Sequence, residues 1–391
     1  MLLKRIEGVL MQYERKQKEE RPVLAICYDF DKTLTPNDMQ AQGYIQSVNY
    51  KVKQFWDDSN KMARDNDMDA NLAYMFKMVT EAEGNFVFNK KALADYGAKV
   101  KLFPGVEDWF KRIKNYGKKH GVIVEHYIIS SGLKEMIEGT KMAKDGDFEK
   151  VYASSFFYNE RGVATWPAQA INYTNKTQFL FRIEKGVLDI NDQGVNEYFS
   201  PEKIRVPFRN IVYIGDSETD IPCMKLVNTY GGHSIGVYDP DKLDKSKVYK
   251  MIRDNRINYY VPADYTEKSE LDSLIKAIID KTVSYERLEE KHIKDLAESK
   301  QYEKNIIIES TVNKSNDVYE NMVAPLTSIL NASLSSSLIT SMKAFQDLFK
   351  NGISSIINSA FIEEDDLNQK NENEKPEDED KENDEGKHQK N

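Results

Sequence analysis

The chain of 391 residues is 40% hydrophobic and 11% aromatic, which is enough for two domains and at least one packed core. Its net charge of −9 is concentrated at the C-terminus, because residues 363–391 contain 13 acidic and 5 basic residues and leave the rest nearly neutral. No basic segment of the kind that binds nucleic acid is present, so we expect no nucleic-acid partner. Two cysteines, Cys27 and Cys223, are too few for a disulfide framework and indicate a reducing, cytoplasmic location.

Residues 1–21 contain apolar residues spaced among Lys, Arg and Glu, with neither a continuous apolar stretch nor a small-residue cleavage site. This pattern predicts an N-terminal amphipathic helix rather than a signal peptide. No uninterrupted apolar run of about 20 residues occurs in the chain, so we expect no transmembrane segment.

Short apolar runs that end in polar residues recur along the chain and predict buried parallel strands. The runs are residues 23–28, 122–129, 150–153, 211–214, 234–238 and 257–261. Segments with helical periodicity, 106–116 and 133–143, lie between them. This alternation predicts an α/β fold with a doubly wound, mostly parallel, Rossmann-like sheet. We assign this core domain to residues 22–36 and 101–282.

Two regions interrupt or follow the core without strands of their own. Residues 37–100 contain helix-compatible runs at 44–64 and 70–83, and predict an inserted, all-helical cap. Residues 283–362 predict a C-terminal helical extension. Within it an apolar stripe recurs every four residues at Leu326, Leu330, Leu334, Leu338 and Met342. We expect oligomerisation or partner docking through residues 283–362, and a disordered acidic tail at 363–391.

The first predicted strand ends in a pair of aspartates, Asp29 and Asp31. Alternation places both carboxylates on the same side of an extended backbone. Two such anions favour a hard cation with oxygen ligands, and Mg²⁺ fits this requirement. One carboxylate can then attack phosphorus, while the other protonates the leaving alkoxide and later activates water.

Further polar groups follow the other predicted strands. Ser130, Ser131 and Gly132 end the second strand, where we expect a helix to begin, and predict a phosphate site of hydroxyl and backbone N–H groups. Lys176 can neutralise charge on the phosphate oxygens. Asp216 and Asp220, four residues apart after a third strand, predict a direct metal ligand and a carboxylate that orients the ligands behind it.

These residues resemble the four motifs of the haloacid dehalogenase (HAD) superfamily: DxDx(T/V), a strand-terminal Ser or Thr, a Lys, and GDxxxD. The resemblance covers residues 22–262, and a helical cap after the first motif is similar to that of the phosphoserine phosphatase-like branch. It implies Asp29 as the nucleophile, Asp31 as the acid and base with its main-chain carbonyl on Mg²⁺, and Asp216 with Asp220 at the metal. It also implies that Ser130 and Lys176 bind phosphate. Ser131, Lys185 and Lys203 are competing candidates for these last two roles.

A second register is open, because Asp31, Lys32 and Thr33 also resemble the phosphorylation motif of P-type ion pumps. Asp31 would then be the nucleophile and Thr33 would replace the acid and base. The chain lacks the transmembrane helices of a pump, and the pair of Asp29 and Asp31 supplies the second carboxylate that rapid turnover needs.

The leading hypothesis is therefore a Mg²⁺-dependent phosphatase that hydrolyses a small phosphorylated metabolite through a phosphoaspartate, with the cap closing over the site. Phosphoserine is the first substrate to test, and the sequence does not assign the cap residues that would bind its amino-acid portion, for which Arg64, Lys77 and Glu81 are candidates. The alternatives are a phosphotransferase on the same site, and a binding or scaffold protein that acts through its C-terminal helical extension.

Overall fold

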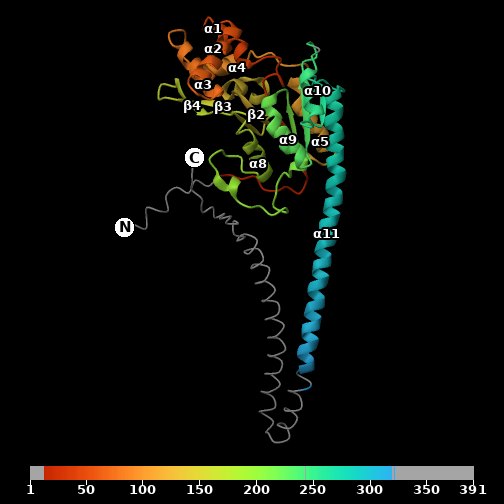
Figure 1. Cartoon of the computed structure of the whole chain (residues 1–391). Coiled ribbons are helices and arrows are strands. Elements are labelled where there is room, and N and C mark those ends of the chain that lie inside the picture. The colour runs from red at the N-terminus through yellow and green to blue at the C-terminus, as the bar shows by residue number, and fades with distance from the viewer. Residues whose placement is uncertain (1–12, 243, 319–320, 322–391) are drawn as a thin grey trace, which may run out of the picture. The chain divides into compact units, whose positions relative to one another are not determined.

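The computed structural model describes residues 13–242, 244–318 and 321. The chain divides into two compact units, Met1–Leu288 and Glu289–Asn391. The first unit holds a sheet, the helices that cover it and a helical insertion (Figure 1).

Seven strands form one sheet in the order β4-β3-β2-β1-β5-β6-β7. The strands are β1 Val23–Tyr28, β2 Ile123–Leu133, β3 Lys150–Tyr158, β4 Ala164–Gln169, β5 Ile211–Gly215, β6 His233–Tyr238 and β7 Tyr259–Pro262. All neighbouring strands are parallel except β3 and β4, which form an antiparallel pair at one edge. The predicted α/β fold with a mostly parallel sheet is confirmed.

Helices cover both faces of this sheet, as the alternation of β1 requires. Leu24, Ile26 and Tyr28 belong to one hydrophobic cluster, whereas the intervening residues Val23 and Ala25 belong to another. The first cluster also contains residues of α5 (Val106–Lys119) and of the first turns of α11 (Glu270–Val318). The second contains residues of α8 (Thr177–Lys185), α9 (Ile221–Thr229) and α10 (Ser246–Arg253). The sheet is therefore doubly wound.

The insertion between β1 and β2 is helical, and Figure 1 shows its helices together near β3 and β4. They are α1 Tyr44–Ser47, α2 Val52–Asp65, α3 Ala70–Ala82 and α4 Lys90–Gly97. The run expected at 44–64 is split, because Asn49 adopts a left-handed φ of 60° that an α-helix does not accommodate. Backbone N–H of Ala164 in β4 donates to the carbonyl of Phe88 at 2.8 Å, which ties the insertion to the sheet edge.

Two local predictions differ from the structure. The expected helix at 133–143 begins at Lys134 and breaks at Thr140, giving α6 (Lys134–Gly139) and α7 (Lys141–Lys144). The expected N-terminal helix is wrong over residues 13–21, which are non-helical. The segment is held by distant ion pairs instead, including Arg15 to Asp192 at 2.8 Å and Lys16 to Glu125 at 2.6 Å. Residues 1–12 lie outside the described part.

Helix α11 runs on from the first unit into the second, where residues 289–318 are helical. The predicted stripe from Leu326 to Met342 and the predicted acidic tail at 363–391 lie outside the described residues. In the described part of the chain, none of the helices combines the length and the apolar composition needed to cross a bilayer.

Candidate active site

The carboxyl ends of β1 and β5 bring together two motifs that are far apart in the sequence. Asp29 directly follows β1, and its backbone N–H donates to the carbonyl of Ile214 in β5 at 2.9 Å. Asp216 directly follows β5. Neighbouring parallel strands end at the same edge of a sheet, so both aspartates project into one place.

Three carboxylates meet at this place. One oxygen each from Asp29, Asp216 and Asp220 lies within 4.8 Å of the other two. The carboxylate of Asp31 is outside this group, contrary to the expectation that the Asp29 and Asp31 side chains face one point. The reason is a hydrogen bond from the backbone N–H of Met39 in the insertion to Asp31 Oδ1, at 2.8 Å.

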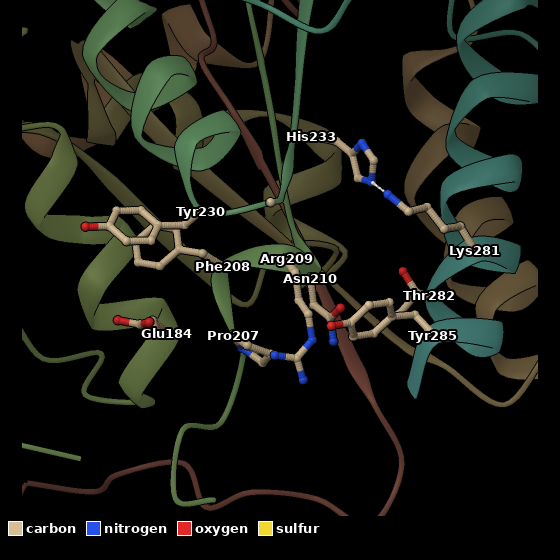
Figure 2. Close-up of a pocket in the computed structure, with 11 residues that line it drawn as sticks. Glu184, Pro207, Phe208, Arg209, Asn210, Tyr230, His233, Lys281, Thr282 and Tyr285 are labelled. Atoms are coloured by element: carbon tan, nitrogen blue, oxygen red, sulfur yellow. Dashed lines mark hydrogen bonds between the residues drawn. The ribbon is translucent and has the colours of Figure 1, made fainter. Parts of the chain in front are cut away.

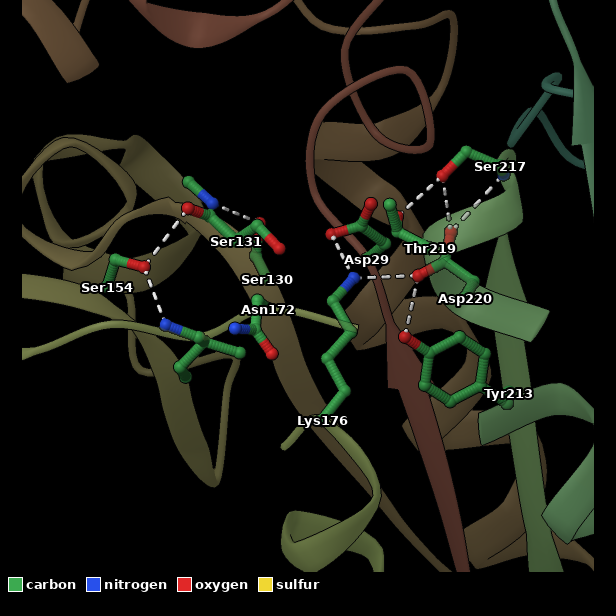
Figure 3. Close-up of polar contacts among 12 residues, drawn as sticks. Asp29, Ser130, Ser131, Ser154, Asn172, Lys176, Tyr213, Ser217, Thr219 and Asp220 are labelled. Atoms are coloured by element: carbon green, nitrogen blue, oxygen red, sulfur yellow. Dashed lines mark hydrogen bonds and ion pairs between the residues drawn. The ribbon is translucent and has the colours of Figure 1, made fainter. Parts of the chain in front are cut away.

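A buried lysine lies against the same carboxylates (Figure 3). Lys176 Nζ is 2.7 Å from Asp220 Oδ1 and 3.3 Å from Asp29 Oδ1, and its side chain is fully buried. The competing Lys185 donates to the carbonyls of Val195 and Glu197 instead. Lys203, the other competitor, is exposed. The structure therefore places the predicted lysine at the carboxylates.

Local structure fixes the position of Asp220. Its Oδ1 accepts a hydrogen bond from the Tyr213 hydroxyl at 2.9 Å, and its Oδ2 accepts from the Ser217 backbone N–H at 3.3 Å (Figure 3). A Cβ atom on Gly215 would lie only 2.6 Å from Asp220 Oδ2, so glycine is required there. Tyr213 is a site residue that sequence reasoning missed, because a strand tyrosine carries no functional pattern of its own.

The residues expected to bind phosphate line the same cavity as Asp29, but their backbone structure differs from the prediction. Ser130, Ser131 and Gly132 remain in β2, and the helix that follows has only six residues, so these residues do not form a helix N-terminus. Ser130 is buried and its Oγ accepts from the Gly132 N–H at 3.0 Å. The carbonyl of Ser131 accepts from the Tyr74 hydroxyl at 2.7 Å, which ties the end of β2 to the insertion.

Burial raises the pKa of three acids in the site. Burial raises the pKa of Asp29 to about 6, against the opposing effect of Lys176. Burial, with Asp220 and Asp29 nearby, raises the pKa of Asp216 to about 8. The pKa of Asp31 is also well above its usual range, because of burial and the charges of Asp38 and Asp29. Lys176 alone does not balance these carboxylates, so the site favours an additional positive charge.

These side chains line a cavity of about 700 Å³. The core contributes Asp29, Asp31, Ser130, Gly132 and Asp216 to its wall. From the insertion come Gln40, Trp56, Met68, Asp69, Ala70, Asn71 and Tyr74, none of which the sequence singled out.

The cap residues proposed from the sequence do not line this cavity. Arg64 is exposed on α2. Lys77 is buried within the insertion, where its Nζ contacts Glu81 at 2.9 Å and the Tyr50 hydroxyl at 3.2 Å. The structure therefore does not place these candidates at the cavity. Lys77 and Glu81 pair with each other because a buried ammonium requires an opposite charge.

A second cavity, of about 430 Å³, lies at the opposite end of the sheet (Figure 2). It is lined by Asn210, which precedes β5, and by His233, which begins β6. Lys281 contacts His233 Nε2 at 3.3 Å, and Arg209 contacts Glu286. None of the predicted site residues lines it.

The comparisons with known proteins identify the family of this chain. Residues 26–225 match the family model of the haloacid dehalogenase-like hydrolases. The chain belongs to this hydrolase family. An uncharacterized protein of Borreliella burgdorferi is 27% identical over 278 residues, which cover 65% of this chain and 95% of the relative.

Two of the solved structures that match the chain do so at low sequence identity. A HAD family hydrolase from Salmonella enterica serovar Typhi gives a TM-score of 0.44 at 16% identity, covering 67% of this chain and 73% of that chain. A phosphoserine phosphatase from T. onnurineus gives a TM-score of 0.37 at 15% identity, covering 66% of this chain and 94% of that chain.

The residues present fit a divalent cation. Asp29 Oδ1 is buried and accepts no hydrogen bond from the described residues, although Lys176 Nζ is near it. Three converging carboxylates with one such unsatisfied oxygen form an all-oxygen donor set of the kind that suits Mg²⁺.

Proposed function

We propose that this hydrolase is a Mg²⁺-dependent phosphatase that acts on a small-molecule phosphate monoester through a phosphoaspartate on Asp29. The supporting observation is the convergence of Asp29 with Asp216 and Asp220 within 4.8 Å, next to the ammonium of Lys176. Asp29 is the one member of this group that also belongs to the first motif.

In this proposal Asp29, Asp216 and Asp220, with the main-chain carbonyl of Asp31, hold Mg²⁺. The ion supplies positive charge to the phosphoryl oxygens when it is bound. Ser130, Ser131 and Gly132 bind the phosphate at the carboxyl end of β2, and Lys176 neutralises part of its charge.

The pKa values of Asp29 and Asp31 support separate roles for these two aspartates of the first motif. With a pKa of about 6, Asp29 is ionised at neutral pH and its oxygen can bond to phosphorus as the ester P–O bond breaks. Burial raises the pKa of Asp31 well above its usual range, which favours the protonated form, and in this form Asp31 transfers its proton to the leaving alkoxide. As a carboxylate it then takes a proton from water, whose oxygen attacks phosphorus and releases Asp29 and inorganic phosphate.

The same geometry favours this register over the pump-like one. Asp31 is outside the carboxylate group, while Asp29 is inside it. A nucleophile that must approach a metal-bound phosphate belongs with the metal ligands.

The test is a screen of phosphorylated metabolites with Mg²⁺ and with EDTA, using the full chain. We expect hydrolysis that requires Mg²⁺, disappears in Asp29→Asn and releases one inorganic phosphate for each ester cleaved. Added alcohols serve as a control for the route. Phosphorylated alcohol in place of inorganic phosphate would identify a phosphotransferase, and no Asp29-dependent turnover of any ester would refute the proposal.

A further inference from the structure

The part of the cavity wall that the helical insertion contributes, which we call the roof, carries little charge. It consists of Gln40, Trp56, Met68, Asp69, Ala70, Asn71 and Tyr74. Among the described residues of the insertion that line the cavity, only Asp38 and Asp69 are charged at neutral pH. Asp38 lies in the turn before the helices, so Asp69 is the one charged residue that the roof contributes. Its Oδ1 accepts from the backbone N–H groups of Asn71 and Leu72 at 2.8 and 3.0 Å. Its Oδ2 accepts from Asn172 Nδ2 at 2.7 Å. Asp69 is therefore committed to the protein and does not serve as the partner of a substrate ammonium.

Two of the described lysines, Lys32 and Lys247, line the cavity, and neither directs its charge towards the roof. Lys32 Nζ is paired with Asp38 Oδ1 at 2.7 Å. Lys247 is exposed on α10 and lowers the pKa of Asp216, so its charge acts at the metal end. The roof thus offers no cation to a substrate carboxylate, which an amino-acid phosphate would require.

Most neutral polar groups of the roof are also occupied. Asn71 Nδ2 donates to the carbonyl of Ile171 at 2.6 Å, and the Tyr74 hydroxyl donates to the carbonyl of Ser131 at 2.7 Å. Two groups differ. Gln40 Oε1 and Trp56 Nε1 are buried and have no hydrogen-bond partner among the described residues. A buried polar group without a partner is unfavourable unless something else satisfies it.

Gln40 stands next to the acid that serves the leaving group. It follows Met39, whose backbone N–H binds Asp31 Oδ1 at 2.8 Å, and its side chain is 2% exposed and lines the cavity. None of the described residues donates a hydrogen bond to Gln40 Oε1. A rotation of the side-chain amide by 180° therefore breaks no hydrogen bond to this oxygen. Gln40 can therefore offer either an acceptor or a donor to a substrate.

An aromatic wall lies over the end of β2. The rings of Trp56 and Tyr74 are 5.7 Å apart and nearly perpendicular, at 68°. The hydroxyl of Tyr74 bonds to Ser131, so this pair stands above the residues that are proposed to bind phosphate. Met68 adds a further apolar surface. Such a wall suits a flat, uncharged ring, and a cavity of about 700 Å³ accommodates a ring together with a phosphate.

We infer that the substrate is the phosphate ester of an uncharged alcohol that carries a flat ring with a hydrogen-bonding group, selected by Gln40 and Trp56. This inference rests on the proposed phosphatase function. It assigns specificity to two residues of the insertion, and it disfavours phosphoserine.

The experiment compares four esters of primary alcohols, so that leaving-group reactivity is similar. They are 3-carbamoylbenzyl phosphate, benzyl phosphate, glycerol 1-phosphate and phosphoserine. For the wild-type protein with Mg²⁺, we expect kcat/KM to fall in that order, by roughly 10²-fold from first to last. Phosphoserine as the best of the four would overturn the inference.

Variants assign the selectivity to residues. Gln40→Leu should lower kcat/KM for the carbamoyl ester about 10-fold and change the benzyl ester less than about twofold. Trp56→Leu should lower both ring esters about 10-fold and leave glycerol 1-phosphate unchanged. The matched controls are Gln54→Leu and Trp166→Leu, which change an exposed glutamine of α2 and an exposed tryptophan of β4.

Thermal melting of each variant separates folding defects from selectivity, and the nearly isosteric Gln40→Glu provides a second test. It places an anion beside the leaving group and should raise kcat/KM for phosphoethanolamine relative to glycerol 1-phosphate. Equal effects of Gln40→Leu on all four esters would overturn the inference while keeping the phosphatase. Absence of Asp29-dependent hydrolysis of all four esters would overturn both.

Discussion

Two buried clusters of charge occupy opposite ends of the sheet and differ in their balance. The carboxyl-end cluster comprises Asp29, Asp216, Asp220 and Lys176. The amino-end cluster comprises Glu125, Arg205, Lys16 and Tyr127. In the first, three carboxylates share one ammonium. In the second, the buried carboxylate of Glu125 has two cations and a hydroxyl as partners, and these cations also pair with the more exposed Glu19 and Glu149.

The balance decides the pKa of each carboxylate. Burial would raise the pKa of Glu125, but hydrogen bonds and charge from Arg205 and Lys16 outweigh it, and the pKa falls to about 2. The guanidinium of Arg205 donates to both carboxylate oxygens of Glu125, at 2.8 and 2.9 Å. At the other end, burial and like charge raise the pKa of Asp216 to about 8. A satisfied charge cluster contributes to the fold, whereas an unsatisfied one marks a place for a ligand.

The largest expected effect is on activity at the carboxyl end. Asp29→Asn removes the proposed nucleophile with little change in shape, so kcat should fall at least roughly 10³-fold. The free energy of unfolding should not fall, because a crowded negative charge is lost. Phosphate release and denaturant unfolding measure the two quantities. Asp57→Asn, at an exposed position of α2, is the control.

Asp31→Asn distinguishes the two registers of the first motif. We expect it to slow both formation and hydrolysis of the phosphoenzyme, because the same carboxyl group transfers a proton in each step. Near-normal kinetics in Asp29→Asn together with an inactive Asp31→Asn would mean that Asp31 is the nucleophile.

The second prediction breaks the balanced cluster. Glu125→Gln leaves the buried guanidinium of Arg205 without its main partner, and should lower the free energy of unfolding by about 3 kcal/mol. Activity per folded molecule should not change, because the cluster is remote from the cavity. Glu149→Gln removes a more exposed partner of Lys16 and should cost less than about 1 kcal/mol. Equal losses in the two variants would contradict the comparison.

The carboxyl-end cluster was largely predictable from sequence, and the amino-end cluster was not. Asp29 and Asp216 each follow an apolar run, and the carboxyl ends of parallel strands align at one edge whatever the loops between them do. Arg15 and Lys16 showed only a local helical pattern. Their partners Asp192 and Glu125 are 177 and 109 residues away, and these contacts override the local preference.

The roof of the cavity was also beyond sequence reasoning. Charged residues such as Lys77 attract attention as substrate binders, yet this lysine pairs with Glu81 inside the insertion. Gln40 and Trp56 become notable only because the folded protein leaves their polar atoms without partners.

β4 was missed because it is a short edge strand that contains Pro167 and exposes Trp166, so it lacks a continuous apolar run.

The third prediction concerns the metal. At a Mg²⁺ concentration about 100 times its Kd, the ion should stabilise the folded protein by about 2.7 kcal/mol, because it binds the native carboxylates and not the unfolded chain. Asp216→Asn should abolish most of this stabilisation. Thermal melting with Mg²⁺ and with EDTA measures it, and Glu125→Gln is the control that should keep the full Mg²⁺ effect. Ca²⁺ and Mn²⁺ titrations would show how selective the cluster is.

The smallest effect, and the one that separates the two clusters by sign, is the pH dependence of stability without metal. Asp216 ordinarily has a pKa of 3.8, which is raised to about 8 in the folded protein. Between these values the folded state binds a proton that the unfolded state has lost, so stability falls as pH rises. Glu125 has the opposite shift, and the stability it contributes is lost as pH falls from its ordinary 4.5 towards 2.

We therefore expect the metal-free protein to lose about 1 kcal/mol of unfolding free energy between pH 6 and pH 7, measured by denaturant titration in EDTA. In Asp216→Asn this slope should decrease by the contribution of Asp216, leaving the part that comes from Asp29 and Asp31, while Glu125→Gln should keep the whole slope. Saturating Mg²⁺ should remove the slope in the wild-type protein, because the bound ion holds the carboxylates in their ionised form. A slope that persists unchanged in Asp216→Asn would mean that Asp216 is not one of its sources, and that the two ends of the sheet differ less than their contacts indicate.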